Sequence, residues 1–274
     1  MRAWAEQSAE RFPLAECEPT LPVAPRDYVD FYASLEHATN VGRMFRPDQP
    51  LERNWRHLPV GYHGRASSVV VSGTPITRPQ GQLGEGRFGP TEALDYECEL
   101  GLVADPGARL FGVVLLNDWS ARDIQAWEYR PLGPFLGKSF ATSISPWIVP
   151  FADLPTTPPR EQEPEPLPYL RDAEPAVQLD LELEVLVNGE VLTRTASRAL
   201  YWTPAQMLAH ATVSGAPVTG GDLFGTGTIS GSEPGSEGCM LERFQGERWL
   251  EDGDEVVLRC PKLGECAGRV LTAR

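Results

Sequence analysis

Residues 178–194 read QLDLELEVLVNGEVLTR, and this stretch indicates the class of fold. At its start, leucine and valine alternate with polar residues, which is the pattern of a β-strand that buries one face. The pair Asn188-Gly189 supplies the positive φ angles of a tight turn, and EVLTR follows as a second strand. The stretch therefore predicts a β-hairpin. Its acidic side chains share one face and are expected in solvent: Asp180, Glu182 and Glu184.

The rest of the chain predicts short strands, turns and few helices. Residues 111–116 (FGVVLL) form an apolar run of strand length, which predicts a strand buried on both faces. Ser120 and Asp123 form an S-x-x-D pattern, which predicts a capping box at the start of a helix. A second helix is expected at 203–213, and a closing hairpin is expected through DGDEVVL. Residues 155–175 are rich in proline and acid and predict an extended surface loop.

These patterns, with 26 glycines and 26 prolines, predict a single β-rich α+β domain. We expect this domain to span residues 27–274. Residues 1–26 are proline-rich and acidic and are interpreted as an N-terminal leader or linker.

The composition bounds the function. The 274 residues carry a formal charge of −14, so we expect no basic face for nucleic acid. No apolar run approaches the length of a membrane span, and the charged N-terminus does not resemble a signal peptide. Five cysteines without a CxxC pair favour neither a disulfide framework nor a zinc site. A soluble, cytoplasmic protein is expected.

Residues 95–100 (DYECEL) place Glu97 and Glu99 on one side of a strand, opposite Cys98. Two explanations are open for this pair. Water solvates both carboxylates on an exposed face, or a hard cation such as Ca²⁺ or Mg²⁺ binds them. The pattern alone favours water, because residues 180–184 show the same alternation in an ordinary hairpin.

Other polar residues are candidates for such a site. Asp118 stands where the apolar strand meets the following helix, a junction where a carboxylate can face a cleft. Asp30 precedes His37 by seven residues, so the two would share a face if both lay on one helix. His37 is a candidate for proton transfer, although a single histidine is more often structural.

The segment after Asp118 offers possible anion-binding groups. Arg122, Gln125 and Tyr129 share a face at helical spacing, and an exposed amphipathic helix explains them equally well. The string GPFLGKS does not match a phosphate-binding loop, because three residues rather than four separate its glycines. Lys138 within it is either a cation of the site or an ordinary surface lysine.

Five strings together resemble the fumarylacetoacetase (fumarylacetoacetate hydrolase) family, and they follow the family's order. They are DFYASLEHATNVG (30–42), LPVGYHGRASS (58–68), LDYECEL (94–100), LNDWSARDIQAWEYRPLGPFLGKSFATSISPW (116–147) and GTISGS (227–232). The resemblance implies metal-dependent hydrolysis of the carbon–carbon bond of 4-fumarylacetoacetate to fumarate and acetoacetate, the final step of tyrosine and phenylalanine catabolism. It also implies a β-sandwich roll that is usually a homodimer.

The resemblance further implies roles for particular residues. The ligands of Ca²⁺ or Mg²⁺ would be Asp30, Glu97, Glu99 and Asp118, with a second ion near Asp118, Lys138 and Thr142. The catalytic residues would be the base His37, its acidic partner Glu242, and the charge-stabilising Arg122, Gln125 and Lys138. The substrate contacts would be Tyr32, Arg46, Tyr62, Gln125, Tyr129 and Thr228.

Two departures from the family leave alternatives open. The full-length enzymes carry an N-terminal β-barrel domain, most of which this chain is expected to lack, and the connection at residues 100–117 is shorter than in relatives. One alternative is therefore a truncated, inactive homologue. The other is a decarboxylase, hydratase or tautomerase of the same superfamily that acts on a small 2-oxo acid.

Overall fold

The structure, a computed structural model, describes residues 16–274. Part of the expected leader at residues 1–26 lies outside the described residues, and residues 17–26 form neither helix nor strand. The first strand is β1 (Tyr28–Phe31), which begins close to the expected start of the domain.

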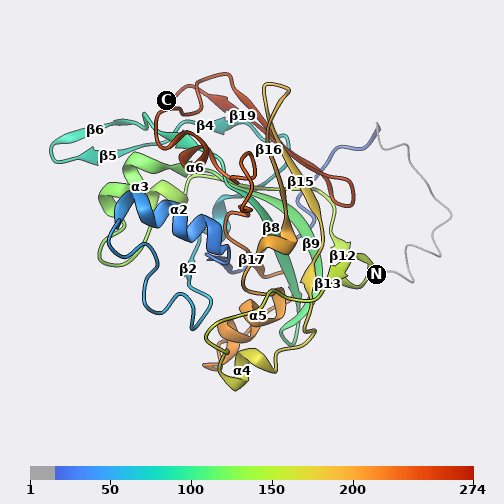
Figure 1. The fold of residues 1–274 in the computed structure, drawn as a ribbon. Coiled ribbons are helices and arrows are strands. Elements are labelled where there is room, and N and C mark those ends of the chain that lie inside the picture. Colours follow the sequence, from blue (N-terminus) through green and yellow to red (C-terminus); the bar gives the residue numbers. More distant parts are fainter. Residues whose placement is uncertain (1–15) are drawn as a thin grey trace.

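An eight-stranded sheet forms one layer of the molecule (Figure 1). The path through it is β2, β1, β17, β8, β9, β11, β3, and β12 pairs with β9 beside this path. Strand β17 lies between β1 and β8. It is parallel to β1 and antiparallel to β8. The bounds of these strands are β2 Gly61–His63, β17 Leu223–Gly225, β8 Cys98–Asp105, β9 Arg109–Asp118, β11 Thr142–Ile144, β3 Val69–Val71 and β12 Val149–Pro150.

The second layer is a five-stranded sheet in the order β16, β15, β18, β19, β4. The hairpin predicted from residues 178–194 is confirmed as β15 and β16, and Asn188 (φ 51°) and Gly189 (φ 82°) form its turn. The closing hairpin is confirmed as β18 and β19. The bounds are β15 Glu182–Val187, β16 Glu190–Ala196, β18 Glu255–Cys260, β19 Gly264–Leu271 and β4 Ile76–Thr77.

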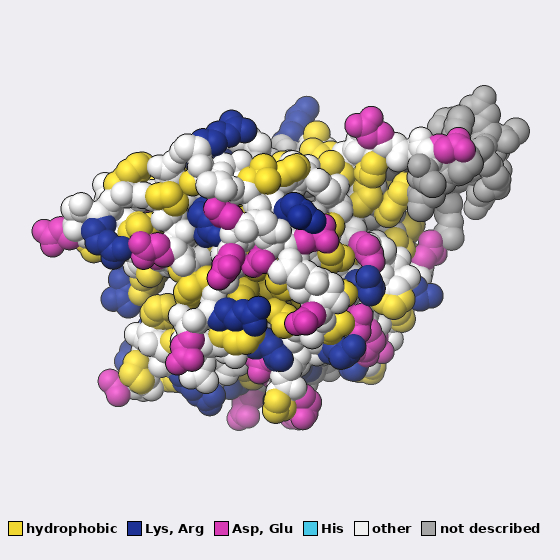
Figure 2. Space-filling model, turned by 90° about the horizontal axis from the view of Figure 1, so that it is seen from above, with side chains coloured by type: hydrophobic (Ala, Val, Ile, Leu, Met, Phe, Trp, Pro, Cys, Tyr) yellow, Lys and Arg dark blue, Asp and Glu magenta, His cyan; other side chains and the backbone are white. Residues whose placement is uncertain are grey.

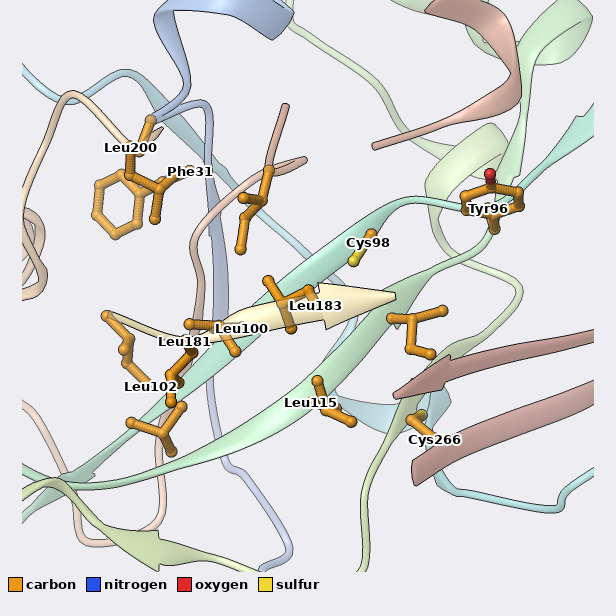
Figure 3. Packing of buried hydrophobic residues seen from close by; sticks show 14 of the residues in the cluster. Phe31, Tyr96, Cys98, Leu100, Leu102, Leu115, Leu181, Leu183, Leu200 and Cys266 are labelled. Carbon is orange, nitrogen blue, oxygen red and sulfur yellow. The ribbon is translucent and has the colours of Figure 1, made fainter. Parts of the chain in front are cut away.

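The two sheets pack face to face, and strand β8 shows how (Figure 3). Its side chains Cys98, Leu100 and Leu102 point into the core, where Leu183 of β15 lies against them. Because side chains alternate along a strand, Glu99 points to the opposite face of the same sheet. That opposite face carries the candidate site.

Strand β9 is buried on both faces, as predicted from residues 111–116. Val113 and Leu115 belong to the main core, whereas Val114 and Leu116 belong to a second buried cluster on the other side of the sheet. The connection from β8 to β9 is a short hairpin turn, and the two strands pair from Cys98 with Asn117 to Asp105 with Arg109, without a helix between them. The short connection at residues 100–117 is therefore compatible with the sheet.

Helices and short strand pairs lie around the two sheets, and Figure 1 labels the five α-helices of residues 16–274 and the pair β5 and β6. The helix predicted at 203–213 is confirmed as α5. The helices are α2 Leu35–Phe45, α3 Arg122–Glu128, α4 Pro168–Arg171, α5 Pro204–Thr212 and α6 Met240–Phe244. The short strand pairs are β7 Leu94–Asp95 with β10 Ser120–Ala121, β5 Gln80–Gly84 with β6 Arg87–Pro90, and β13 Thr156–Thr157 with β14 Gln178–Leu179.

Two local predictions were wrong. The capping box does not form, because Ser120 lies in β10 and its hydroxyl donates to the carbonyl of Asp118. The carboxylate of Asp123 instead accepts a hydrogen bond from the backbone of Glu92. Asp30 does not share a helix with His37, because Asp30 lies on β1 and His37 on α2.

The loop predicted at residues 155–175 is largely irregular and exposed, although β13 and α4 interrupt it. On the face shown in Figure 2, Lys and Arg side chains are interspersed with Asp and Glu. Within residues 16–274, no helix has the length and apolar character that crossing a membrane requires.

Candidate active site

Four buried carboxylates meet at one point of the eight-stranded sheet. Asp30 comes from β1, Glu99 from β8 and Asp118 from the end of β9, and Glu97 immediately precedes β8. Each of the four offers an oxygen, and these oxygens lie within 4.8 Å of one another. We call this group the acidic cluster. The structure thus brings together all four residues that the family resemblance implied as metal ligands.

The small residue Gly225 of β17 makes this convergence possible. Strand β17 separates β1 from β8, so any side chain at position 225 would stand between Asp30 and Glu99. A Cβ built there would lie 2.8 Å from Asp30 Oδ1 and 2.9 Å from Glu99 Oε2. Glycine leaves this space to the carboxylates.

Two buried cations compensate part of the negative charge. Lys138 Nζ lies 2.5 Å from Glu97 Oε2 and 2.6 Å from Asp118 Oδ2. Arg122 Nη1 lies 2.7 Å from Glu97 Oε1, and Arg122 Nε donates to Asp95 Oδ2 at 2.9 Å. Lys138 is therefore not a surface lysine, and the cations are outnumbered by the carboxylates around them.

The remaining excess of buried negative charge shifts the pKa values of the carboxyl groups in the acidic cluster. Burial raises the pKa of Asp30 well above its usual range, and the neighbouring Asp118 adds to this effect. Burial and Asp30 together raise the pKa of Glu99 in the same way. Burial acts on Glu97 as well, but the ammonium group of Lys138 and other positive neighbours hold the pKa of Glu97 below its usual range.

Two oxygens of the acidic cluster, Asp30 Oδ1 and Glu99 Oε1, have no hydrogen-bond partner among the described residues. A buried carboxylate oxygen without a partner costs free energy. A divalent cation would satisfy both oxygens, and a set of carboxylates suits hard cations such as Ca²⁺, Mg²⁺ or Mn²⁺. The residues present therefore fit a metal centre.

Two hydroxyl groups orient the other carboxylate oxygens. Tyr62 donates to Asp30 Oδ2 at 2.7 Å and also lies 3.2 Å from Asp118 Oδ2. Thr142 of the neighbouring strand β11 donates to Asp118 Oδ1 at 3.0 Å. These contacts involve Asp30 Oδ2 and leave Asp30 Oδ1 without a hydrogen-bond partner among the described residues.

A histidine–glutamate pair lies beside the acidic cluster. His37 stands in the first turn of α2, where Ser34 caps the helix by accepting from the backbone N–H of His37. The Nδ1 of His37 lies 2.5 Å from Glu242 Oε1 on α6. Burial opposes ionisation of Glu242, but its contacts with His37 and Ser230 lower the pKa of this carboxyl group. Glu242 therefore holds the imidazole by Nδ1 and leaves Nε2 available.

Two polar residues that the sequence did not single out fix Glu242. Ser230 donates to Glu242 Oε1 at 2.7 Å, and Asn40 donates to Glu242 Oε2 at 3.0 Å. Both lie inside strings that carry the family resemblance, Asn40 at 30–42 and Ser230 at 227–232. A search of those strings for further polar residues would have found them.

Asp30 and Glu97 of the acidic cluster and His37 of the histidine–glutamate pair line one cavity of about 410 Å³. Thr228 Oγ1 is buried there without a hydrogen-bond partner among the described residues. The Oε1 of Gln125 accepts from Arg122 at 3.3 Å, so its amide N–H groups are the donors that remain for a ligand. The residues implied as substrate contacts all line this cavity: Tyr32, Arg46, Tyr62, Gln125, Tyr129 and Thr228.

The sequence matches the family described as fumarylacetoacetate (FAA) hydrolase C-terminal over residues 27–271. The chain belongs to this family. Among the family's relatives, fumarylacetoacetase of Rattus norvegicus is 47% identical over 300 residues, covering 92% of this chain and 71% of the rat protein. Fumarylacetoacetase of Oryza sativa subsp. japonica is 46% identical over 307 residues, covering 95% of this chain and 71% of the rice protein.

A solved structure supports the fold of this fumarylacetoacetate hydrolase family member. Maleylpyruvate hydrolase from Sphingobium sp. SYK-6, in complex with manganese(II) ion and pyruvate, has a TM-score of 0.62 to this chain. The match covers 100% of this chain and 82% of the other, and the sequences are 19% identical. At that identity the likeness concerns the fold alone. The predicted β-rich α+β class is confirmed.

Proposed function

We propose that this protein hydrolyses a carbon–carbon bond of fumarylacetoacetate, consuming one water and releasing fumarate and acetoacetate in tyrosine catabolism. One observation carries the proposal: a single cavity joins a carboxylate cluster suited to a metal with a buried histidine–glutamate pair. The fumarylacetoacetases of rat and rice, at 47% and 46% identity, support the same reaction.

The acidic cluster would hold Ca²⁺ or Mg²⁺ through Asp30, Glu97, Glu99 and Asp118. A divalent cation bound there supplies Lewis-acid polarisation of a substrate carbonyl group. The ammonium group of Lys138 has no lone pair and therefore cannot bind a cation. Lys138 could bind a second ion near Asp118 and Thr142 only through its backbone carbonyl oxygen. In the mechanism we assign the side chain of Lys138 to charge compensation.

His37 would act as the base that activates water. Its Nδ1 is held by Glu242, so Nε2 is the nitrogen that can accept a proton on the cavity side. The resulting hydroxide attacks the substrate carbonyl carbon, and Glu242 stabilises the imidazolium that forms. The pair thus supplies a positioned proton acceptor, which typically contributes about 10²- to 10⁴-fold in rate.

The difficult step is the departure of a carbon leaving group as an enolate. Gln125, Arg122 and Lys138 line the cavity beside the acidic cluster, where donors and positive charge favour developing negative charge. Arg122 and Lys138 already form ion pairs with the carboxylates around them, so these two stabilise negative charge mainly through the electrostatic effect of their positive charges, and Gln125 adds amide N–H groups.

Arg46 is the cavity cation least committed to the acidic cluster, and it lies 3.2 Å from Glu52 at the exposed side. We propose that Arg46 binds a carboxylate of the substrate. Tyr32, Tyr62, Tyr129 and Thr228 would then contribute further polar contacts along the cavity. A local cation of this kind lets an acidic protein accept an anionic substrate.

The test is an activity assay that follows loss of the ultraviolet absorbance of fumarylacetoacetate. After removal of divalent ions by a chelator, activity should vanish and should return on addition of Mg²⁺ or Ca²⁺. His37→Ala should lose at least about 10²-fold in kcat, whereas exposed His57→Ala serves as the matched control. Oxaloacetate decarboxylation in place of fumarylacetoacetate cleavage would refute the proposal in favour of the other superfamily chemistry. Absence of both activities would favour the inactive homologue.

We further propose that residues 27–274 form the catalytic domain and that the protein acts as a homodimer in the cytoplasm. Large exposed apolar side chains support a partner surface, among them Leu132 at 95% and Phe135 at 57% exposure. The buried free thiols of Cys98 and Cys266 suit a reducing compartment. Analytical ultracentrifugation tests the dimer, and a single sedimenting monomer at all concentrations would exclude it.

A further inference from the structure

Asp95, the first residue of the DYECEL string, is fully buried and accepts hydrogen bonds on both carboxylate oxygens. Its Oδ1 accepts from the backbone N–H of Tyr96 and of Met240, each at 2.8 Å. Its Oδ2 accepts from the backbone N–H of Leu241 at 3.1 Å and from Arg122 Nε at 2.9 Å. Apart from Tyr96, these donors belong to the two helices that carry groups of the active site.

The first link runs to the helix that carries Glu242. Helix α6 begins after Cys239, whose side chain makes no capping hydrogen bond. Asp95 accepts the first two helical N–H groups, Met240 and Leu241, which would otherwise be unsatisfied in the protein interior. Glu242 follows directly, so Asp95 fixes the helix end from which Glu242 reaches His37.

The second link runs to the acidic cluster. Arg122 has Asp95 on one side and Glu97 on the other, at 2.9 Å from Nε and 2.7 Å from Nη1. The same Nη1 donates to Gln125 Oε1 at 3.3 Å. Asp95 therefore restrains the side chain that holds Glu97, a member of the acidic cluster, and Gln125, a donor that lines the cavity.

We propose that Asp95 is a positioning residue for the hydrolytic reaction, which keeps the His37–Glu242 pair and the Arg122–Glu97 pair in fixed relation. The inference rests on the proposed function. Capping α6 and pairing with Arg122 are structural contacts, and each of them ends at a group of the active site. Because one carboxylate makes both contacts, it links the two halves of the site.

The test compares Asp95→Asn with Asp123→Asn. The asparagine keeps the shape of Asp95 but turns an N–H group toward one of the donors that Asp95 now accepts. Asp123 is a matched control. This second acid accepts hydrogen bonds from the backbone N–H of Glu92 and the hydroxyl of Thr91, away from the cavity.

We expect Asp95→Asn to lower kcat at least about 30-fold while KM changes less than about threefold, because the reacting groups rather than the substrate contacts are misplaced. Asp123→Asn should keep kcat within about threefold of wild type.

A double variant distinguishes positioning from general loss of stability. In the background of Glu242→Gln, which already disables the His37–Glu242 pair, Asp95→Asn should reduce kcat further by clearly less than about 30-fold, because only the part that acts through Arg122 and Glu97 remains. A full additional 30-fold loss would overturn the inference, since Asp95 would then act independently of the pair.

Two measurements keep the test decisive. Metal-dependent thermal melting with Mg²⁺ shows whether Asp95→Asn is folded, and Asp95→Ser, which can still cap one helical N–H, replaces it if it is not. Failure of both variants to fold would assign Asp95 a structural role and reject the inference. An active wild type with an equally active Asp95→Asn would also reject it, whereas an inactive wild type would reject the proposed function instead.

Discussion

Gly225→Ala adds a single methyl group at the point where Asp30 and Glu99 meet. Gly225 lies in strand β17, and its backbone φ does not fall in the left-handed region, so alanine introduces no backbone strain. The perturbation is therefore confined to the space between two carboxylates. It tests whether the acidic cluster is a metal centre without removing any charge.

The size of the effect follows from the contacts. The new Cβ would lie 2.8 Å from Asp30 Oδ1 and 2.9 Å from Glu99 Oε2. Carbon–oxygen contacts of this kind are usually about 3.3 Å or longer, so the carboxylates must move by roughly 0.4 to 0.5 Å. Metal–ligand distances tolerate only about 0.2 Å. We expect the affinity for Mg²⁺ or Ca²⁺ to fall about 10- to 100-fold, or about 1.4 to 2.8 kcal/mol.

Isothermal titration calorimetry with each metal ion measures the affinity directly, and thermal melting without metal measures the cost of the added methyl group. Gly89→Ala is the control, because Gly89 also lies in a strand and a Cβ there meets nothing within 4 Å. If Gly225→Ala bound metal within about twofold of wild type while remaining folded, the reasoning about a metal centre at this point would be refuted.

Three further predictions concern the same site and its surroundings. Glu242→Gln should lower kcat about 10²-fold, because an uncharged amide cannot stabilise the imidazolium that forms at His37. Stopped assays over a range of substrate concentrations measure kcat, and an unchanged kcat would contradict this prediction. Burial and like charges raise the pKa of Asp30 and Glu99 in the metal-free fold, so these two groups hold protons there that they lose in the unfolded chain, and their contribution to stability falls as pH rises above about 4. Because protons compete with metal, the gain in melting temperature from Mg²⁺ should be larger at pH 8 than at pH 6, and an equal or smaller gain at pH 8 is the contrary result. Glu182→Gln on the solvated hairpin face should change the free energy of unfolding by less than about 1 kcal/mol in urea denaturation, since it removes only an exposed ion pair.

The hairpin of β15 and β16 could be predicted from the sequence because its signals are local. Alternation fixes the buried face and Asn188-Gly189 fixes the turn, and both lie within one short stretch. The prediction that acidic side chains on this hairpin face solvent also holds, because Glu184 pairs with exposed Arg194. The local pattern was sufficient wherever the partner strand was the next one along the chain.

The same pattern could not predict whether Glu97 and Glu99 face solvent or are buried. They alternate with apolar residues as Glu182 and Glu184 do, and they are buried only because other elements pack on the outer face of β8. Those elements are supplied by distant residues, among them Lys138, which forms ion pairs inside the site. Family resemblance located these residues, whereas spacing alone did not.

The two wrong local predictions have a related cause. The S-x-x-D pattern at Ser120 is a weak signal, and the pairing of β10 with β7 takes the residue that would have been the cap. The seven-residue spacing between Asp30 and His37 indicated a common helix, but a strand end and a helix start bring both side chains to the cavity by another route. Tertiary pairing outweighed local spacing in both cases.

The place of β17 between β1 and β8 has a consequence for biosynthesis. Its residues, Leu223–Gly225, leave the ribosome long after both neighbours. Until they arrive, the nascent polypeptide exposes two unpaired strand edges, because β1 and β8 both lack the neighbour that lies between them in the sheet. A premature stop before Leu223 should therefore yield an aggregation-prone fragment that added metal does not rescue.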